Sequence, residues 1–385
     1  MIKNIPRLLR LVGTIALIST IQKAVASSSL DFSIQQPYIS SQAMTIGNAY
    51  SAVVRDYSAI FYNPAALARR EDGNLHFWTR GAVDSGILDL VDDIKNINSD
   101  GTKSEQIDRM INLAESKYGE HFFARLPTLG GSWVRPKWGV TFILADFSMD
   151  SSLHQQLGPM FNVNANLDTT VAFAYANNIS EDHSLSAGIT LKAIHRFFIG
   201  EAISAADLVG ETNPFNQKVI KEGLTVDADI GFLYNPKQPE DSILSVLSPS
   251  SLAFVVRNVG DYGFIELADK DAPPPLGRRF DFGSKWNLPG LSVFKPYLSC
   301  DIRDISHKNW TLKKGLHLGF GLPWEMASWW KGYWGVGLNQ GYLSGGVGAL
   351  LGWFQIDFAT WGEEVGTTGA PKESRRYMLE LSIDI

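Results

Sequence analysis

Few residues of this 385-residue chain have the types and spacing that chemistry requires. Cys300 is the single cysteine, which excludes an intrachain disulfide and a cysteine-rich metal site. Gly345-Gly-Val-Gly348 lacks the Lys-Ser/Thr and the following helix of a phosphate loop, and no serine stands in a nucleophile elbow. The histidines, none of which has metal-ligand spacing, are His76, His121, His154, His183, His195, His307 and His317. The sequence therefore predicts no catalytic residue, no metal site and no cofactor, and we expect that the protein is not an enzyme.

Some charged residues stand at every second position of apolar segments. Asp227 and Asp229 point the same way on a predicted strand, where a carboxylate pair could perform acid–base chemistry. The alternative is that they are hydrated groups inside a barrel, paired with Arg or Lys of neighbouring strands. Asp301 and Arg303 have the same spacing, and His317 alternates with apolar residues. We interpret all five as candidates for the polar lining of a lumen.

The segments that carry these residues have the periodicity of β-strands. From Leu224 to Phe232, apolar residues alternate with polar ones that include Asp227 and Asp229, and residues 378–385 alternate in the same way. In a soluble sandwich the apolar face points inward. In an outer-membrane barrel the apolar face meets lipid and the polar face lines the lumen. Alternation alone does not separate these two folds.

Three features favour the membrane barrel. The chain ends on a predicted strand at Ile385 without a trailing tail. Long and short connections alternate along the chain, as expected for long outer loops and short periplasmic turns. The connection 236–250 is the exception. Tryptophans stand near predicted strand ends, as in the aromatic girdles of barrels: Trp78, Trp133, Trp138, Trp286, Trp310, Trp334, Trp353 and Trp361. The predicted strands are 73–82, 128–135, 138–149, 161–176, 184–198, 224–235, 251–258, 277–286, 295–304, 313–321, 332–339, 344–350, 353–361 and 376–385.

The N-terminal residues predict export. Lys3, Arg7 and Arg10 precede the short apolar run 11–21, and Ala24-Val25-Ala26 is a small-x-small cleavage site, which is the order of a secretory signal peptide. We expect cleavage after Ala26 and a final location in the outer membrane of a Gram-negative-type bacterium. No later stretch reaches the roughly 20 apolar residues of a transmembrane helix, so a membrane-embedded chain must be a closed barrel. The excess of 40 acidic over 34 basic residues argues against nucleic-acid binding.

Residues 84–118 predict two helices inside the first long connection. Apolar residues recur at helical spacing in both halves, with Asp84 or Ser85 as the cap of the first helix and Ser104 as the cap of the second. Two interpretations stay open. The pair is either a lid or ligand-contacting loop, or a packed excursion of the loop.

Residues 27–72 precede the first strand and are too irregular for a barrel wall. They contain the run from Gly47 to Leu67 (GNAYSAVVRDYSAIFYNPAAL), whose small residues allow close approach of backbones and whose Asn63-Pro64 predicts a turn. This run resembles the N-terminal signature of the long-chain fatty acid transporter (FadL-like) superfamily of outer-membrane barrels. Residues 188–194 and 339–377 resemble the subgroup that holds TraF-like conjugation proteins and PorV-type barrels.

The resemblance implies an all-β membrane fold, a 14-stranded antiparallel outer-membrane β-barrel whose N-terminal segment folds into the lumen as a hatch. The domains are then a signal peptide (1–26), a hatch (27–72) and a barrel (73–385), with 84–118 as a helical extracellular loop. In fatty acid transporters of this family a kink in a wall strand opens a lateral exit, and the sequence does not place such a kink here. The hatch positions that match the signature, which we expect to be structural, are Gly47, Ala49, Ala52, Asp56, Ala59, Asn63, Pro64, Ala65 and Leu67.

Two functions from different classes follow. The first is passive transport of hydrophobic small molecules, such as long-chain fatty acids, which requires an apolar and partly occluded lumen. The second is an interaction barrel that binds or anchors envelope, secretion or conjugation proteins, with 84–118 and 199–223 as its partner surface. We favour the first because it is the function that the superfamily resemblance implies. The expected partners are outer-membrane lipid, hydrophobic small molecules or fatty acids, and in the second case envelope proteins.

Overall fold

A computed structural model describes residues 32–99, 102–155, 159–204, 220–238, 248–267, 270–367 and 369–385. The predicted signal peptide lies outside the described residues. Fourteen antiparallel strands form one closed wall, in which each strand pairs with its neighbours along the chain and β15 pairs with β1. The prediction of a fourteen-stranded barrel is confirmed. Strand β8 (Ile265–Glu266) pairs only with β6 and is not part of this ring.

The wall strands have the following bounds. They are β1 Asn74–Asp84, β2 His121–Arg135, β3 Trp138–Gln155, β4 Pro159–Asn178, β5 Leu185–Ser204, β6 Lys221–Tyr234, β7 Ser251–Arg257, β9 Arg279–Asn287, β10 Tyr297–Ile305, β11 Leu316–Ala327, β12 Trp330–Asn339, β13 Tyr342–Leu351, β14 Phe354–Glu364 and β15 Glu373–Asp384. Strand β2 begins seven residues earlier than predicted. Strand β11 begins three residues later because a short helix, α8 (Leu312–Gly315), occupies the predicted start.

The two faces of the wall differ in polarity. Val171, Phe173 and Tyr175 of β4 point outward and are 44 to 48% exposed, whereas Ala172 and Ala174 between them are fully buried. Exposed aromatic residues also gather at the short turns, where Trp133 stacks edge-on against Trp138 and Trp329 lies beside Trp330. An apolar outer face that ends in an aromatic belt is the surface of a membrane barrel. Two of the predicted belt residues are placed differently, because Trp78 and Trp361 are inside the barrel.

Among the described residues, none of the helices is long and apolar enough to cross a membrane.

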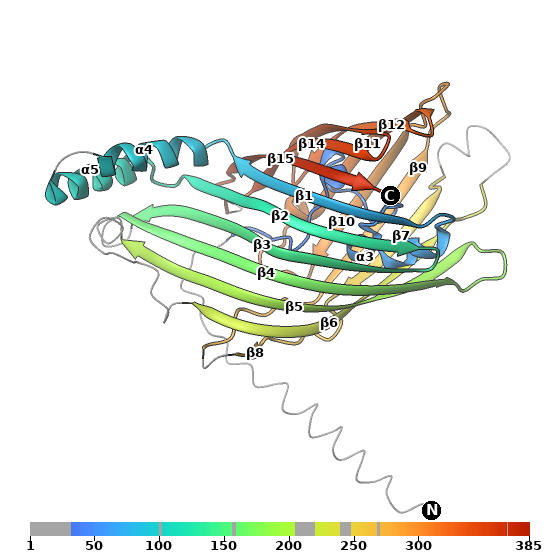
Figure 1. Ribbon diagram of the computed structural model, residues 1–385, viewed down its shortest axis with the longest axis horizontal. Helices are drawn as coiled ribbons and strands as arrows, with labels where there is room; N and C mark the ends of the chain where they lie inside the picture. The colour runs from blue at the N-terminus through green and yellow to red at the C-terminus, as the bar shows by residue number, and fades with distance from the viewer. Residues whose placement is uncertain are drawn as a thin grey trace, which may run out of the picture.

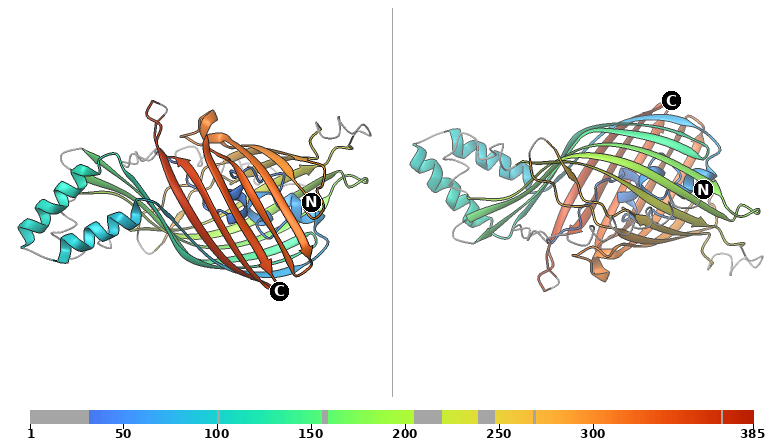
Figure 2. Two further views of the ribbon diagram at one scale, coloured as in Figure 1. Left: turned by 90° about the horizontal axis from the view of Figure 1, so that it is seen from above. Right: turned by 90° about the horizontal axis from the view of Figure 1, so that it is seen from below.

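The wall is much taller on one side than on the other. Strands β4 and β5 have 20 residues each, whereas β7 has seven. A tilted strand needs only about 9 to 11 residues to cross a bilayer. The long strands therefore extend beyond the barrel as a projecting sheet, which carries two helices at its end (Figures 1 and 2).

Helices α4 (Ile87–Ser99) and α5 (Lys103–Ser116) cover the outward face of this projecting sheet. A capping box between Thr102 and Glu105 begins α5, so the cap is two residues earlier than the predicted Ser104. The apolar side chains buried between helices and strands are Ile87, Leu90, Ile97, Met110, Ala114, Phe122, Ala124, Leu153, Phe161, Val163 and Ala165. The strand residues in this group continue the outward apolar face of the wall. The helices therefore cover this face above the membrane, as lipid covers it within the membrane. This packing agrees with the interpretation of residues 84–118 as a packed excursion of the loop.

The N-terminal part of the chain lies inside the barrel, as the blue ribbon in Figure 2 shows. It contains α2 (Ser41–Thr45), α3 (Ala59–Tyr62) and the 3-10 helix η1 (Pro64–Arg69). We call residues 41–69 the luminal segment. Helix α2 contacts β12, β13 and β14, while η1 contacts β4, β5 and β6 on the opposite wall. The segment thus crosses the whole lumen and shares a buried apolar cluster with inward residues of the wall.

Candidate functional site

The turn at Asn63-Pro64 is fixed against the wall by one side chain. Fully buried Asn63 donates hydrogen bonds to the carbonyls of Ser51 and Phe232 at 3.0 and 3.2 Å, and its Oδ1 accepts one from the amide of Ala65. Pro64 follows at the first position of η1, where its missing N–H costs nothing. The chain therefore reverses here without leaving a buried donor unpaired.

Two wall glycines make room for this turn. A Cβ added to Gly231 of β6 would lie 2.2 Å from Asn63 Oδ1, and one added to Gly188 of β5 would lie 2.5 Å from the carbonyl carbon of Pro64. Gly47 fulfils the same need in the luminal segment, since its Cβ would lie within 2.5 Å of two backbone oxygens of β11 and β12. Gly47 also has φ +65°, a conformation that other L-residues rarely adopt. Close backbone contact thus explains Gly47 of the signature run and the two wall glycines.

The remaining signature residues pack inside the lumen. Ala49, Ala59, Ala65 and Leu67 are completely buried, and Ala52 is nearly so. Asp56 caps its own turn, where its carboxylate accepts hydrogen bonds from Ser58 and from Tyr50 Oη at 3.0 Å. Burial raises the pKa of the Asp56 carboxyl above its ordinary value, although these hydrogen bonds act in the opposite direction.

The five predicted lumen residues all lie inside the barrel, and three of them bind the luminal segment. Asp301 accepts a hydrogen bond from the amide of Ser51 at 2.8 Å, and His317 Nδ1 lies 2.8 Å from the carbonyl oxygen of Gly47. Arg303 donates to the carbonyl of Asn48 at 3.0 Å and lies over the ring of Tyr62.

The other two predicted residues serve the wall itself. Asp229 binds Lys192 Nζ of β5 at 2.6 Å and the amide of Asn258. Asp227 accepts a hydrogen bond from the amide of Gly260 at 2.7 Å. These two carboxylates are therefore not arranged as an acid–base pair, because each is bound by different partners.

Asp304 is a luminal anchor that the sequence did not predict. Its carboxylate accepts hydrogen bonds from Arg257 and Arg279, both at 3.1 Å, and from Gln36 Nε2 at 2.6 Å. Asp304 and its neighbour Arg303 both point inward because the register shifts between Ile302 and Ile305 and Asp304 has φ +57°. Strict alternation would place Asp304 outside. In the sequence, the only feature that pointed to Asp304 was its proximity to the predicted residues Asp301 and Arg303.

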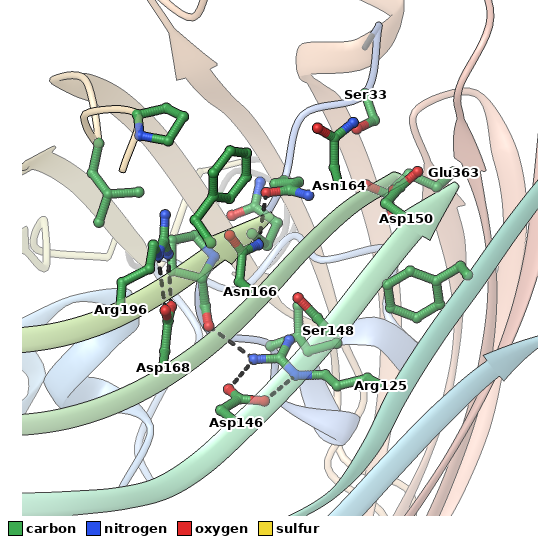
Figure 3. A pocket seen from close by; sticks show the side chains of 18 of the residues that line it. Ser33, Arg125, Asp146, Ser148, Asp150, Asn164, Asn166, Asp168, Arg196 and Glu363 are labelled. Atoms are coloured by element: carbon green, nitrogen blue, oxygen red, sulfur yellow. Dashed lines mark hydrogen bonds and ion pairs between the residues drawn. The ribbon is translucent and has the colours of Figure 1, made fainter. Parts of the chain in front are cut away.

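An ion-pair-lined cavity of about 170 Å³ lies on the long-loop side of the luminal segment (Figure 3). We call it the outer cavity. Arg196 and Asp168 form a two-bond pair on one side of it, at 2.8 and 2.6 Å, and Arg125 pairs with Asp146 on another. Apolar side chains complete the lining, namely Ile39, Phe123, Phe198, Leu276 and Trp361. The outer cavity is therefore amphipathic, whereas passage of a wholly apolar molecule would require an apolar lumen.

The wall beside the outer cavity is interrupted in three adjacent strands. Between the pairs Arg125–Ser148 and Leu129–Leu144, residues 126–128 of β2 have no registered partner in β3, and the β1–β2 register also shifts here. Pro127 has no N–H to offer a ladder, and Ala145 has φ +49°. We call residues 126–128 and 145–147 the wall defect. Inside it, the Arg125–Asp146 pair closes the gap, and Arg125 also binds the carbonyl of Pro37.

An apolar groove of about 660 Å³ lies on the exterior of the same strands. Its lining, drawn from β15, β1, β2, β3 and the start of β14, includes Phe77, Leu129, Phe142, Leu144 and Ile383. We call it the exterior groove. Gly131 thins the outer face of the wall here, since a Cβ on it would lie 3.1 Å from the ring of Phe77. The wall defect therefore separates an amphipathic cavity inside the barrel from an apolar groove outside it.

A third cavity, of about 690 Å³, lies on the other side of the luminal segment, at the end of the short turns. We call it the turn-side chamber. The luminal segment contributes Tyr50, Arg55 and Tyr57 to its lining, whereas residues 35–37 and Ile39 face the outer cavity. The N-terminal part of the chain therefore divides the lumen into two compartments. Within the described part of the chain, no group of three or more His, Cys, Asp or Glu is arranged to hold a metal ion.

No protein-family model matches the chain, and no curated protein matches its sequence. Solved structures that resemble it include the CymD monoaromatic hydrocarbon channel, at 11% identity and a TM-score of 0.48, covering 89% of this chain and 95% of that one. The Ralstonia pickettii toluene transporter TbuX has 11% identity and a TM-score of 0.48, with 90% and 98% covered. A Pseudomonas aeruginosa FadL homologue has 11% identity and a TM-score of 0.45, with 91% and 99% covered. At these values the likeness assigns neither a family nor a substrate to this chain.

Proposed function

We propose that the protein is a FadL-like outer-membrane barrel through which an amphipathic small molecule, such as a long-chain fatty acid, passes by diffusion. The observation that carries this proposal is the wall defect, which lies between the outer cavity and the exterior groove. The residues of the wall defect lack a regular ladder, and the groove outside it is almost entirely apolar. The residues 27–72 would act as the hatch, and the exported barrel would lie in the outer membrane of a Gram-negative-type bacterium.

The difference in polarity between the outer cavity and the exterior groove suggests how a substrate would be oriented at the wall defect. A carboxylate or other polar group fits among Arg125, Arg196 and Asn164 in the outer cavity. The apolar part of the molecule fits the exterior groove, where burial against Leu129 and Phe142 recovers roughly 25 cal/mol per Å² of apolar surface. Lateral exit is favoured over straight passage because the hydrogen-bonded luminal segment divides the lumen.

A disulfide across the edge of the wall defect tests the lateral route. Leu129 and Leu144 are directly opposed and both point outward. In a Cys300→Ser background, Leu129→Cys with Leu144→Cys should reduce uptake of radiolabelled oleate at least tenfold when oxidised, and reductant should restore it. The matched control is Val347→Cys with Phe358→Cys, an outward pair on β13 and β14.

Unchanged uptake in the oxidised Leu129–Leu144 variant would refute the lateral route, as would an equal loss in the control pair. Cells that express the unmodified chain and take up no more oleate than cells without it would refute transport of this substrate class altogether. The interaction-barrel alternative stays a prediction. Its expected partner surface has two parts. The helix pair packs its apolar side against the projecting sheet. In the other part, the loop 199–223, residues 205–219 lie outside the described residues.

A further inference from the structure

The lining of the turn-side chamber carries an excess of positive charge. Its basic residues are Arg55, Arg70, Lys285, Lys295 and Lys331, and its acidic residues are Asp56, Glu325 and Asp384. Two of these carboxylates already have partners, because Asp56 is bound by Tyr50 and Ser58, and Asp384 by Asn74 and His76. The positive charge of the chamber therefore favours the entry of anions from the turn side.

Lys285 is the central cation of this chamber. It is 7% exposed and stands on β9 between Ser251 of β7 and Ser299 of β10. Its Nζ lies 4.8 Å from the centre of the Tyr297 ring. Within the described part of the chain its side chain forms no hydrogen bond and no ion pair. A largely buried lysine without a carboxylate partner is available to pair with an anion that enters the chamber.

Arg55 provides a second cation from the luminal segment. It lines the same chamber as an exposed side chain. Within the described part of the chain its guanidinium forms no ion pair, whereas its carbonyl oxygen accepts a hydrogen bond from Arg70. Two mutually repelling cations that face one cavity from different elements define a site for a negatively charged group.

The surroundings indicate which kind of anion fits. Tyr50, Tyr57, Tyr297 and Tyr333 line the chamber together with Trp324. Aromatic faces favour an apolar or aromatic body, while a guanidinium and an ammonium favour a carboxylate. We propose that the turn-side chamber binds an organic carboxylate with an apolar or aromatic body, whose charged group lies between Lys285 and Arg55. This proposal extends the proposed function, since it gives the same class of molecule a second site behind the luminal segment.

Equilibrium binding to the full-length barrel in nanodiscs of neutral lipid tests the site. The probes are 4-phenylbutyrate, the uncharged 4-phenylbutanol and inorganic phosphate, measured by titration calorimetry against empty nanodiscs. We expect phenylbutyrate to bind at least tenfold more tightly than either of the other two. Lys285→Met should abolish this preference and Arg55→Gln should reduce it several-fold. Lys331→Gln, which changes an exposed cation of the same chamber, should leave it intact.

Equal affinity for the acid and the alcohol would overturn the proposal, as would an unchanged preference in Lys285→Met. Phosphate that binds as tightly as phenylbutyrate would overturn the claim for an organic body. Lys285→Arg separates the effect of the charge from an effect on folding, because it keeps the charge and should retain the preference for phenylbutyrate. Loss of the preference in Lys285→Arg as well would overturn the role assigned to this charge. Binding is measured without transport. A barrel that binds phenylbutyrate but gives no oleate uptake would refute the transport proposal and leave the site in the turn-side chamber standing.

Discussion

Replacement of Asn63 by alanine should loosen the luminal segment while the barrel stays folded. The side chain forms three hydrogen bonds, to the Ser51 carbonyl, the Phe232 carbonyl and the Ala65 amide, and it is completely buried. Each such bond contributes about 1 kcal/mol net. The loss of all three should therefore cost about 3 kcal/mol, which is roughly a 100-fold increase in the open population of the segment because 1.4 kcal/mol is tenfold.

Hydrogen exchange measured by mass spectrometry gives the direct test. Peptides that cover residues 47–67 should exchange about 100-fold faster in Asn63→Ala, whereas peptides of β12 and β13 should not change. The control is Gln238→Ala, which removes two hydrogen bonds, to the carbonyls of Pro236 and Pro249, in an exposed connection on the short-turn side. If exchange of 47–67 changes less than threefold, or changes equally in the control, Asn63 does not hold the segment. Planar-bilayer conductance should rise in parallel, because the lumen behind the segment is polar.

Three other changes have clear expectations. Asp304→Asn should lower the urea midpoint of the barrel and speed exchange around Gln36, because two buried arginines lose their shared carboxylate at a cost of about 3 kcal/mol or more. Burial and the charge of Arg279 lower the pKa of His307 to about 4, so the stability contributed by its neutral form is complete above pH 6.5 and is lost as pH falls through about 4. Exchange of residues 305–311, corrected for intrinsic rates, should therefore rise between pH 6.5 and 4 in the unmodified chain and not in His307→Gln. Phe173→Arg should destabilise the barrel in lipid vesicles by about 2 to 4 kcal/mol, while Asn177→Arg near the turn should cost at most about 1 kcal/mol, and equal urea midpoints would contradict membrane insertion of β4.

The sequence predicted the features that depend on local periodicity. Alternation in β6 and β15 gave the correct faces, since Leu224 and Leu379 point outward while Asp229 and Glu380 point inward. Alternation fails wherever the register shifts. Asp304 points inward because β10 bulges, and the wall defect joins residues whose positions are set by pairing across three strands. Neither the bulge in β10 nor the outer cavity can be predicted from the sequence of one strand, because both depend on how neighbouring strands align.

Tertiary contacts also decided what the helix pair does. Its amphipathic pattern fitted a lid and a packed excursion equally well, because both require one apolar face. The choice between these two interpretations depends on the position of the residues by which β2 to β5 exceed the other strands. These strands rise beyond the short wall at β7 and keep their apolar outward residues, including Phe161 and Val163. Beyond the bilayer such residues need a cover, and α4 with α5 supply it.

The polar interior changes what a hydrophobic route through this barrel must look like. A molecule that is wholly apolar would have to cross a cavity whose charged side chains have left water only as ion pairs, Arg125 with Asp146 and Arg196 with Asp168. An amphipathic molecule instead exchanges one polar partner for another at the wall defect and places its apolar part in the exterior groove. The charge pattern thus favours substrates with a head group. The same reasoning, applied to Lys285 and its missing counter-charge, predicts that this head group is negative.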